Sequence, residues 1–200
     1  TWLATPVRLD TDAPGAGSSQ QLDIAVWEDA VFVVWVDLRH TSSNNESDVY
    51  FNRSLDQGTS WLASDVRVEQ DTPGFDVSAD PVVAVSEDSV FVAWQDLRPT
   101  LTPDGEIFAN ASVDGGITWQ PVDHMLSGGF ASDDRRDPRI APNGDIVHVS
   151  WIFDQDNAIY TNRSLDGGAT WEGEVRRSPF STNPWSYDLA AEGESVYLAW

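Results

Sequence analysis

The sequence predicts an all-β protein, a β-propeller built from four-stranded antiparallel blades, and three observations carry this prediction. An eight-residue motif of the form Ser-x-Asp-x-Gly-x-Thr/Ser-Trp occurs three times, and two series of tryptophans recur at intervals of 49 to 59 residues. The apolar runs between them are strand-length and show no helical period. Repeated units of this kind bury their apolar faces only against one another, and four short strands per repeat are typical of propeller blades. The motif copies are residues 54–61, 112–119 and 164–171; the tryptophans are Trp35, Trp94, Trp151 and Trp200 in one series and Trp2, Trp61, Trp119 and Trp171 in the other.

Within each repeat the four strands are predicted in order. The first follows an aspartate, and in two repeats Asp-Pro opens it, because a strand start tolerates the missing amide of proline. The second is a β-branched and aromatic run that ends in a tryptophan. The third leads into the motif, which forms a hairpin turn, and the fourth follows the motif's tryptophan. First strands are expected after Asp23, Asp80, Asp137 and Asp188, third strands at 48–52, 106–110 and 157–162, and a fourth strand at 61–68.

These strands make the 200 residues a single propeller region. Residues 2–10 repeat residues 61–69 almost one for one, so residues 1–10 are expected to end a preceding blade. Three whole blades and two partial ones predict an incomplete part of a ring of roughly 6 to 8 blades. The expected segments are 1–20 (tail of a preceding blade), 21–76, 77–132 and 133–182 (blades), and 183–200 (start of a further blade).

The charge of the chain restricts its partners. It has 33 acidic and 11 basic residues, a net charge of −22, and no lysine. Nucleic acid is excluded as a partner, because phosphate backbones are bound by lysine and arginine clusters. Such a surface suits a halophilic setting or a calcium-rich exterior, since salt screens the self-repulsion. No cofactor and no metal-ligand set are predicted, although calcium is possible at an acid-rich loop, residues 154–157.

Other features bear on location. No apolar run reaches the roughly 20 residues of a membrane span, and the absence of cysteine excludes disulfides. Four Asn-x-Ser sequons fit a secreted or cell-surface glycoprotein. In three of them the serine also begins the repeated motif, so glycosylation and simple repetition both explain the pattern. The possible glycosylation sites are Asn45, Asn52, Asn110 and Asn162.

The residue types of the motif predict a turn held by its own side chains. The aspartate carboxylate and serine hydroxyl accept hydrogen bonds from turn amides, glycine supplies a positive φ, and tryptophan places apolar surface under the hairpin. The expected structural set is Ser54, Asp56, Gly58, Trp61, Ser112, Asp114, Gly116, Trp119, Ser164, Asp166, Gly168 and Trp171.

This motif resembles the Asp-box, or BNR repeat, of sialidases (neuraminidases) and other Asp-box β-propellers. The resemblance implies a sialidase-like propeller with the boxes on its periphery, away from any catalytic centre, and so it implies a fold and not a reaction. Sialidases are retaining glycosidases that use a tyrosine paired with a glutamate, an aspartate acid/base and three arginines that clamp the sugar carboxylate.

The match to a sialidase site is incomplete. Arg98 and Asp104 are similar to the family's arginine and acid/base pair and are the candidate catalytic residues. The place of the family's Arg-Ile-Pro reads Ala79-Asp80-Pro81, where an aspartate would repel a sialic acid. Arg39 and Arg98 both close a repeated Asp-Leu-Arg. They are therefore either ties between aspartate and arginine at a strand end or repeated binding subsites.

The leading hypothesis is an extracellular, non-catalytic recognition or assembly scaffold, possibly glycan-binding, with a carbohydrate or protein partner and possible self-assembly. The alternative is an exo-sialidase or other glycoside hydrolase whose remaining catalytic residues lie outside this sequence. Turnover of a fluorogenic sialoside that Asp104→Asn abolishes would favour the alternative.

Overall fold

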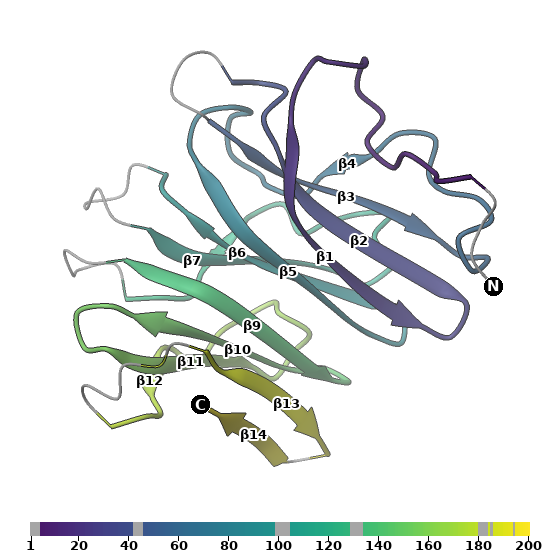
Figure 1. Ribbon diagram of the computed structural model, residues 1–200. Coiled ribbons are helices and arrows are strands. Elements are labelled where there is room, and N and C mark those ends of the chain that lie inside the picture. Colours follow the sequence, from purple (N-terminus) through teal and green to yellow (C-terminus); the bar gives the residue numbers. More distant parts are fainter. Residues whose placement is uncertain are drawn as a thin grey trace.

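A computed structural model of the chain describes residues 5–41, 46–98, 105–128, 134–179, 184, 186–193 and 195–200. These residues form strands and turns, with no helix among them, which confirms the all-β prediction (Figure 1). Within the described ranges there is accordingly no helix with the length and apolar character that a membrane crossing requires.

Within the described residues, consecutive strands form four antiparallel sheets, three of them four-stranded. The first sheet holds β1 (Ser19–Trp27), β2 (Ala30–Asp37), β3 (Asp48–Ser54) and β4 (Val66–Arg67). The second holds β5 (Ser78–Ser86), β6 (Ser89–Asp96), β7 (Glu106–Ser112) and β8 (His124–Met125). The third holds β9 (Arg135–Asn143), β10 (Ile146–Phe153), β11 (Ala158–Ser164) and β12 (Val175–Arg176). The last is the hairpin of β13 (Asp188–Glu192) and β14 (Ser195–Ala199).

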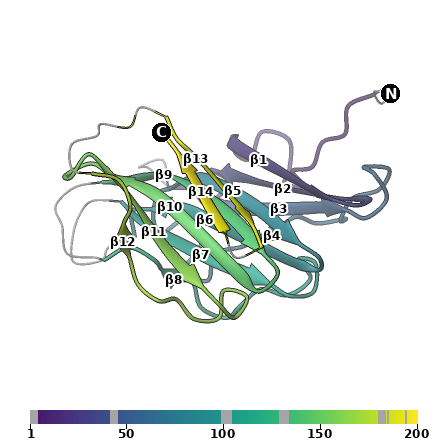
Figure 2. The same cartoon turned by 90° about the horizontal axis from the view of Figure 1, so that it is seen from below.

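The sheets follow one another with their first strands side by side. β1 contacts β5, β5 contacts β9, and β9 contacts β13 (Figure 1). Figure 2 shows the same sheets from below. Consecutive four-stranded sheets that pack through their first strands are the arrangement expected of propeller blades around a hub.

The core lies between neighbouring sheets. Phe32 and Phe51 of the first sheet pack in one cluster with Trp94 and Phe108 of the second. Each large apolar side chain that is fully buried in this way contributes about 1.5–3 kcal/mol. Most of the apolar burial of a sheet therefore depends on the next sheet, as the repeat pattern predicts.

The first strands begin earlier than the sequence predicts. β5 starts at Ser78 and passes through Asp80 and Pro81 in a bulge, where the register with β6 shifts. Asp80 has a φ of 48°, and the equivalent residues Gln21 and Asp137 have φ values of 50° and 53°. A proline fits this position because a bulge leaves its extra residue unpaired. The prediction that Asp-Pro opens a strand was therefore wrong.

The fourth strand is shorter than predicted. Only Val66 and Arg67 pair with β3. After Trp61 the amide of Leu62 donates both to the backbone oxygen of Arg53 in β3 at 3.2 Å and to Asn52 Oδ1 at 3.1 Å. The propensity pattern could not show that this asparagine side chain shares the amide with the strand.

Candidate functional site

The two ends of each blade differ in construction. At the turn end, the eight-residue motif bonds to the hairpin that joins the first two strands of the same blade. At the loop end lie the segments that follow the second and fourth strands. The bonds that join motif and hairpin are Gln57 N to Asp29 O (2.8 Å), Gly115 N to Asp88 O (2.7 Å) and Gly167 N to Asp145 O (2.8 Å).

The first copy of the motif at the turn end closes on itself. Ser54 Oγ accepts a hydrogen bond from Gly58 N at 2.8 Å and donates one to Asp56 Oδ1 at 2.8 Å. Asp56 also accepts from the amide (2.7 Å) and the hydroxyl (2.6 Å) of Ser60. Gly58 has a φ of 82°. These are the hydrogen bonds that the residue types predict.

The other two copies repeat this geometry. Each serine Oγ accepts a hydrogen bond from the glycine amide at 2.8 Å, and each aspartate Oδ1 accepts one from the threonine amide at 2.8 Å. Hydrogen bonds from the threonine hydroxyls and amides lower the pKa of Asp114 and of Asp166 to about 2. The residues concerned are Ser112, Asp114, Gly116 and Thr118 in the second copy and Ser164, Asp166, Gly168 and Thr170 in the third. All of these polar groups are engaged within the turn.

The tryptophans of the turns reach beyond their own hairpins. Trp119 packs edge-on against Phe51 of the preceding sheet, with ring centroids 5.2 Å apart. Gly116 lies against the same ring, because a Cβ built there would sit 2.5 Å from Phe51 Cε1. Trp61 donates through Nε1 to Gly58 O at 3.1 Å. The motif therefore joins neighbouring sheets as well as closing a turn.

At the loop end of the first blade, Asp37 and Arg39 form a tie. Trp35 Nε1 (3.2 Å) and Arg39 Nη2 (2.9 Å) both donate to Asp37 Oδ2. Arg39 Nη2 also bonds Asp65 at 2.7 Å, and its guanidinium lies 3.8 Å from the Tyr50 ring centroid. The predicted binding residue Arg39 is thus half-enclosed by carboxylates and an aromatic ring.

The second blade repeats the tie. Trp94 Nε1 (2.9 Å) and Arg98 Nη2 (2.6 Å) donate to Asp96 Oδ2, and Arg98 Nη1 bonds Asp123 at 3.1 Å. Beside them, burial and the charges of Asp96 and Asp71 raise the pKa of Asp76 to about 6. Arg98 is therefore held by its own blade. Asp104, its proposed catalytic partner, lies outside the described residues.

The third blade lacks the tie. Phe153 stands where Asp37 and Asp96 stand in the other blades, and the buried Trp151 Nε1 has no hydrogen-bond partner within the part of the chain that is described. The guanidinium of Arg135 lies 4.4 Å from the Phe153 ring centroid and pairs with Glu106 at 3.1 Å. The repeat is thus kept at the turn end and changed at the loop end.

Three of the sequon asparagines have structural contacts. Their side chains bond to the backbone of the segment after the motif or of a neighbouring loop, and the residues are at most 3% exposed. A glycan could not be attached without displacing these bonds. These three are Asn52, Asn110 and Asn162, whereas Asn45 lies outside the described residues.

The bulges of the first strands meet at the hub, at the loop end. They border a hollow of about 340 Å³, within the range of roughly 300–1,000 Å³ for small-molecule sites. Gln21 Nε2 donates to Asp80 Oδ1 at 2.9 Å, and Val83 N donates to Asp23 Oδ2 at 2.9 Å, so side chains join neighbouring blades here. The hollow is lined by Gln21, Leu22, Asp23, Asp80, Pro81, Val82, Asp137 and Arg139.

The hollow contains groups suited to polar ligands. Burial, and then the charge of Asp137, raise the pKa of Asp80. The guanidinium of Arg139 lies 5.4 Å from the Tyr187 ring centroid, and Tyr187 OH donates to Asp137 O at 2.6 Å. The carboxylates can accept hydrogen bonds from hydroxyl groups, and the guanidinium can donate hydrogen bonds to them. Three carboxylates against one arginine leave the hollow acidic.

From the sequence, Asp23, Asp80 and Asp137 were expected to precede first strands, and Asp80 also marked the mismatch to a sialidase arginine. Neither Gln21 nor Arg139 was a candidate site residue. The signal available was the recurrence of polar residues near the start of each first strand. Their convergence was not visible, because they come from three different repeats.

The acid-rich loop expected to favour calcium is engaged in other bonds. Asp154 pairs with Arg136 at 2.9 Å, and Asp156 accepts a hydrogen bond from Tyr160 OH. Among the described residues, two groups of three acidic side chains have oxygens close enough to share an ion. They are Asp10, Asp12 and Asp37, and Asp48, Glu69 and Asp71.

No protein-family profile matches this chain. No curated protein sequence matches it either. Solved structures do. The GH93 α-L-arabinofuranosidase of Fusarium graminearum superimposes with a TM-score of 0.62 at 14% identity, over 90% of this chain and 54% of that one.

Two further structures are similar. Zg3597, a family 117 glycoside hydrolase from Zobellia galactanivorans, has a TM-score of 0.57 at 13% identity, over 92% of this chain and 64% of that one. An α-L-arabinanase of Penicillium chrysogenum has a TM-score of 0.57 at 15% identity, over 91% and 54%. This chain therefore spans between half and two thirds of these proteins, and it shares the propeller fold of glycoside hydrolases.

Proposed function

We propose that this chain is a carbohydrate-binding, sialidase-like Asp-box β-propeller that acts outside the cell and holds a neutral glycan in the hub hollow. The observation that carries the proposal is the meeting of Asp23, Asp80, Asp137 and Arg139 around one hollow of ligand size. The similar structures act on arabinose-containing substrates or are glycoside hydrolases, which supports a sugar as the ligand.

The charge of the hollow selects among sugars. Ionised carboxylates accept hydrogen bonds from sugar hydroxyls and repel a sugar carboxylate. A sialic acid would need arginines that outnumber the acids, which this hollow does not offer. A neutral glycan is therefore the ligand that its charge favours.

Binding to the purified whole chain tests the proposal. Arabino-oligosaccharides and a sialoside are titrated calorimetrically, and the neutral sugars are expected to bind more tightly. Arg139→Ala and Asp80→Asn should each weaken binding at least about tenfold, since a hydrogen bond to a charged group contributes about 1.5–3 kcal/mol. Asp145→Asn, which removes an exposed carboxylate at the turn end, is the matched control. Equal affinity in all four proteins would overturn the hub site.

A second candidate function is glycoside hydrolysis, favoured by the raised pKa of Asp80 beside Asp137. A carboxyl group with a raised pKa beside a second carboxylate is an arrangement from which a general acid can act. Chromogenic aryl arabinofuranosides and sialosides test it. Loss of turnover in Asp80→Asn supports an acid at the hub, whereas loss only in Asp104→Asn would place the chemistry beside Arg98.

A further inference from the structure

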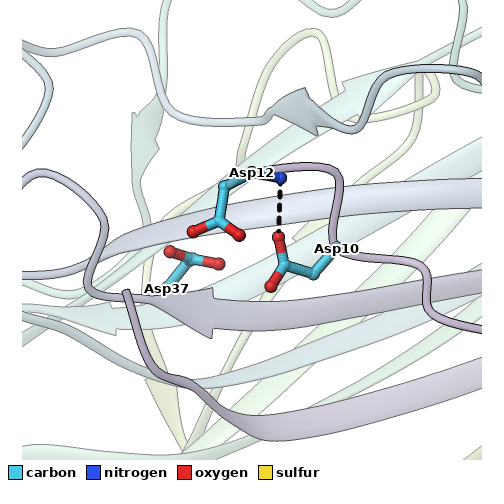
Figure 3. Close-up of side chains that lie close together, drawn as sticks. All are labelled: Asp10, Asp12 and Asp37. Carbon is cyan, nitrogen blue, oxygen red and sulfur yellow. Dashed lines mark hydrogen bonds between the residues drawn. The ribbon is translucent and has the colours of Figure 1, made fainter. Parts of the chain in front are cut away.

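A cluster of three aspartates joins the N-terminal segment to the first blade. Asp10 and Asp12 come from the segment before β1, and Asp37 ends β2. One carboxylate oxygen from each lies within 4.8 Å of the others. Figure 3 shows the carboxylates of Asp12 and Asp37 facing one another, with Asp10 beside them and its Oδ1 accepting the amide of Asp12 at 3.0 Å.

One oxygen of this cluster has no partner. The Asp12 side chain is only 7% exposed. Its Oδ2 atom is buried and makes no hydrogen bond within the described part of the chain. A buried carboxylate oxygen without a donor is unfavourable, so the cluster favours a cation that would bind it.

The second acidic cluster provides a matched comparison. There, the buried Arg67 lies among the acids, 2.8 Å from Asp48 and 3.2 Å from Glu69, and it also pairs with Asp71. All the carboxylate oxygens of that cluster are either bonded or solvent-accessible within the described structure. The equivalent arginine of the first cluster, Arg8, is 47% exposed and pairs with Asp10 and Asp12, while Arg39 pairs with Asp37 at 2.9 Å and with Asp10 at 3.3 Å. Arginines therefore bond the acids of both clusters, and the first cluster differs in Asp12 Oδ2, which no donor of the described residues reaches.

The surrounding charges leave room for a divalent ion. The acids of the first corner are Asp10, Asp12, Asp37 and Asp65, and its cations are Arg8 and Arg39, so the corner carries two net negative charges. The hydroxyl of Ser19 lies 3.2 Å from Asp10 and 3.1 Å from Asp37 and offers a further oxygen. A set of oxygens without nitrogen or sulfur favours calcium or magnesium over transition metals.

We propose that Asp10, Asp12 and Asp37 bind one calcium ion, with Asp12 Oδ2 as a direct ligand. Calcium accepts several protein oxygens in flexible geometry, whereas magnesium retains most of its water. The ion would fasten the N-terminal segment to the first blade, where Thr11 already bonds Asp65 through its hydroxyl at 2.8 Å. This site is independent of the sugar proposed at the hub.

Terbium luminescence tests the site, because Trp35 donates to Asp37 and can transfer its excitation to a bound lanthanide. The whole chain, freed of metal by chelation, is expected to show terbium emission under tryptophan excitation. Calcium should displace the terbium and magnesium should not. Asp12→Asn should weaken calcium binding at least about tenfold, the smallest loss typical of altering a metal site. Calcium should also raise the Tm of the wild type.

Two controls make the outcome decisive. Asp145→Asn removes an exposed carboxylate elsewhere, and Asp71→Asn alters the second cluster; both should keep wild-type calcium affinity. Near-ultraviolet circular dichroism checks folding, and Asp10→Asn replaces Asp12→Asn should the latter fail to fold. No emission from the wild type, equal affinity in the aspartate variant, or equal displacement by magnesium would each overturn the proposal.

Discussion

The turn end and the loop end of the blades differ in how uniformly their side chains repeat. At the turn end, serine, aspartate, glycine and tryptophan adopt one geometry in all three blades, down to a 2.8 Å bond between serine and glycine. At the loop end, the tie of tryptophan, aspartate and arginine is present in two blades and replaced by Phe153 in the third. Uniform positions hold the sheets together, and variable positions surround the hollow and the acidic corners.

The largest effect is expected from breaking a loop-end tie. Asp96→Ala leaves Arg98 and Trp94 Nε1 without their shared acceptor, and removing one partner of a buried pair costs about 3–5 kcal/mol. Urea unfolding measures the loss. In a double variant, Arg98→Ala added to Asp96→Ala should cost less than the sum of the two single changes. A loss below about 1 kcal/mol for Asp96→Ala would show that the tie is not structural.

The next prediction compares two buried tryptophans. Trp94 and Trp151 are both fully buried, but only Trp94 donates a hydrogen bond to a carboxylate. Trp94→Phe should therefore lower the free energy of unfolding by about 1.5–3 kcal/mol more than Trp151→Phe. Denaturant titration of both variants provides the difference. Equal losses would mean that the two loop ends are energetically alike.

The turn end should respond uniformly. Ser54→Ala, Ser112→Ala and Ser164→Ala each leave a buried glycine amide without its acceptor, at a cost of about 1–3 kcal/mol. The three losses in thermal or chemical unfolding should agree within experimental scatter. One blade that differs clearly from the other two would contradict the uniformity of this end.

The smallest expected effect is an opposite pH dependence at the two ends. Asp114 and Asp166 have pKa values of about 2, below the unfolded value of about 4, so their stabilisation is lost as pH falls from about 4 to 2. Asp76 has a raised pKa of about 6, so the folded state binds the extra proton and stability falls as pH rises from about 4 to 6.

Two variants separate these contributions. Asp114→Asn should flatten the acidic part of the stability profile, and Asp76→Asn should flatten the part between about pH 4 and 6. Thermal unfolding across pH in one buffer series measures both. Unchanged slopes in either variant would remove that residue from the comparison.

The sequence predicted what depends on local chemistry. Ser54 and Asp56 can bond only to amides within a few residues, and Asp37 lies two residues from Arg39, so both arrangements could be inferred from residue types. The bulge at Asp80 was missed because its positive φ comes from pairing with a neighbouring strand and not from propensity. The hub hollow was missed because its residues stand nearly one repeat apart.

The fourth strand and the Asp12 cluster were missed for a related reason. After Trp61 the chain bonds both to the backbone of Arg53 and to the side chain of Asn52, and no strand pattern encodes the second bond. Asp12 becomes a member of an acidic group only when the N-terminal segment folds beside β2. Contacts between repeats therefore define most of the candidate site, and single-repeat patterns cannot show them.

The bulge at the hub keeps one backbone conformation in three blades while its side chains differ. The bulge has the same backbone in three blades, with φ near 50° at Gln21, Asp80 and Asp137. The residue two positions later differs in each blade and is Asp23, Val82 or Arg139. A repeated backbone therefore displays a different set of side chains in each blade, which is compatible with the sugar proposed at the hub. Side chains there can be exchanged one position at a time, without changing the sheets that carry them.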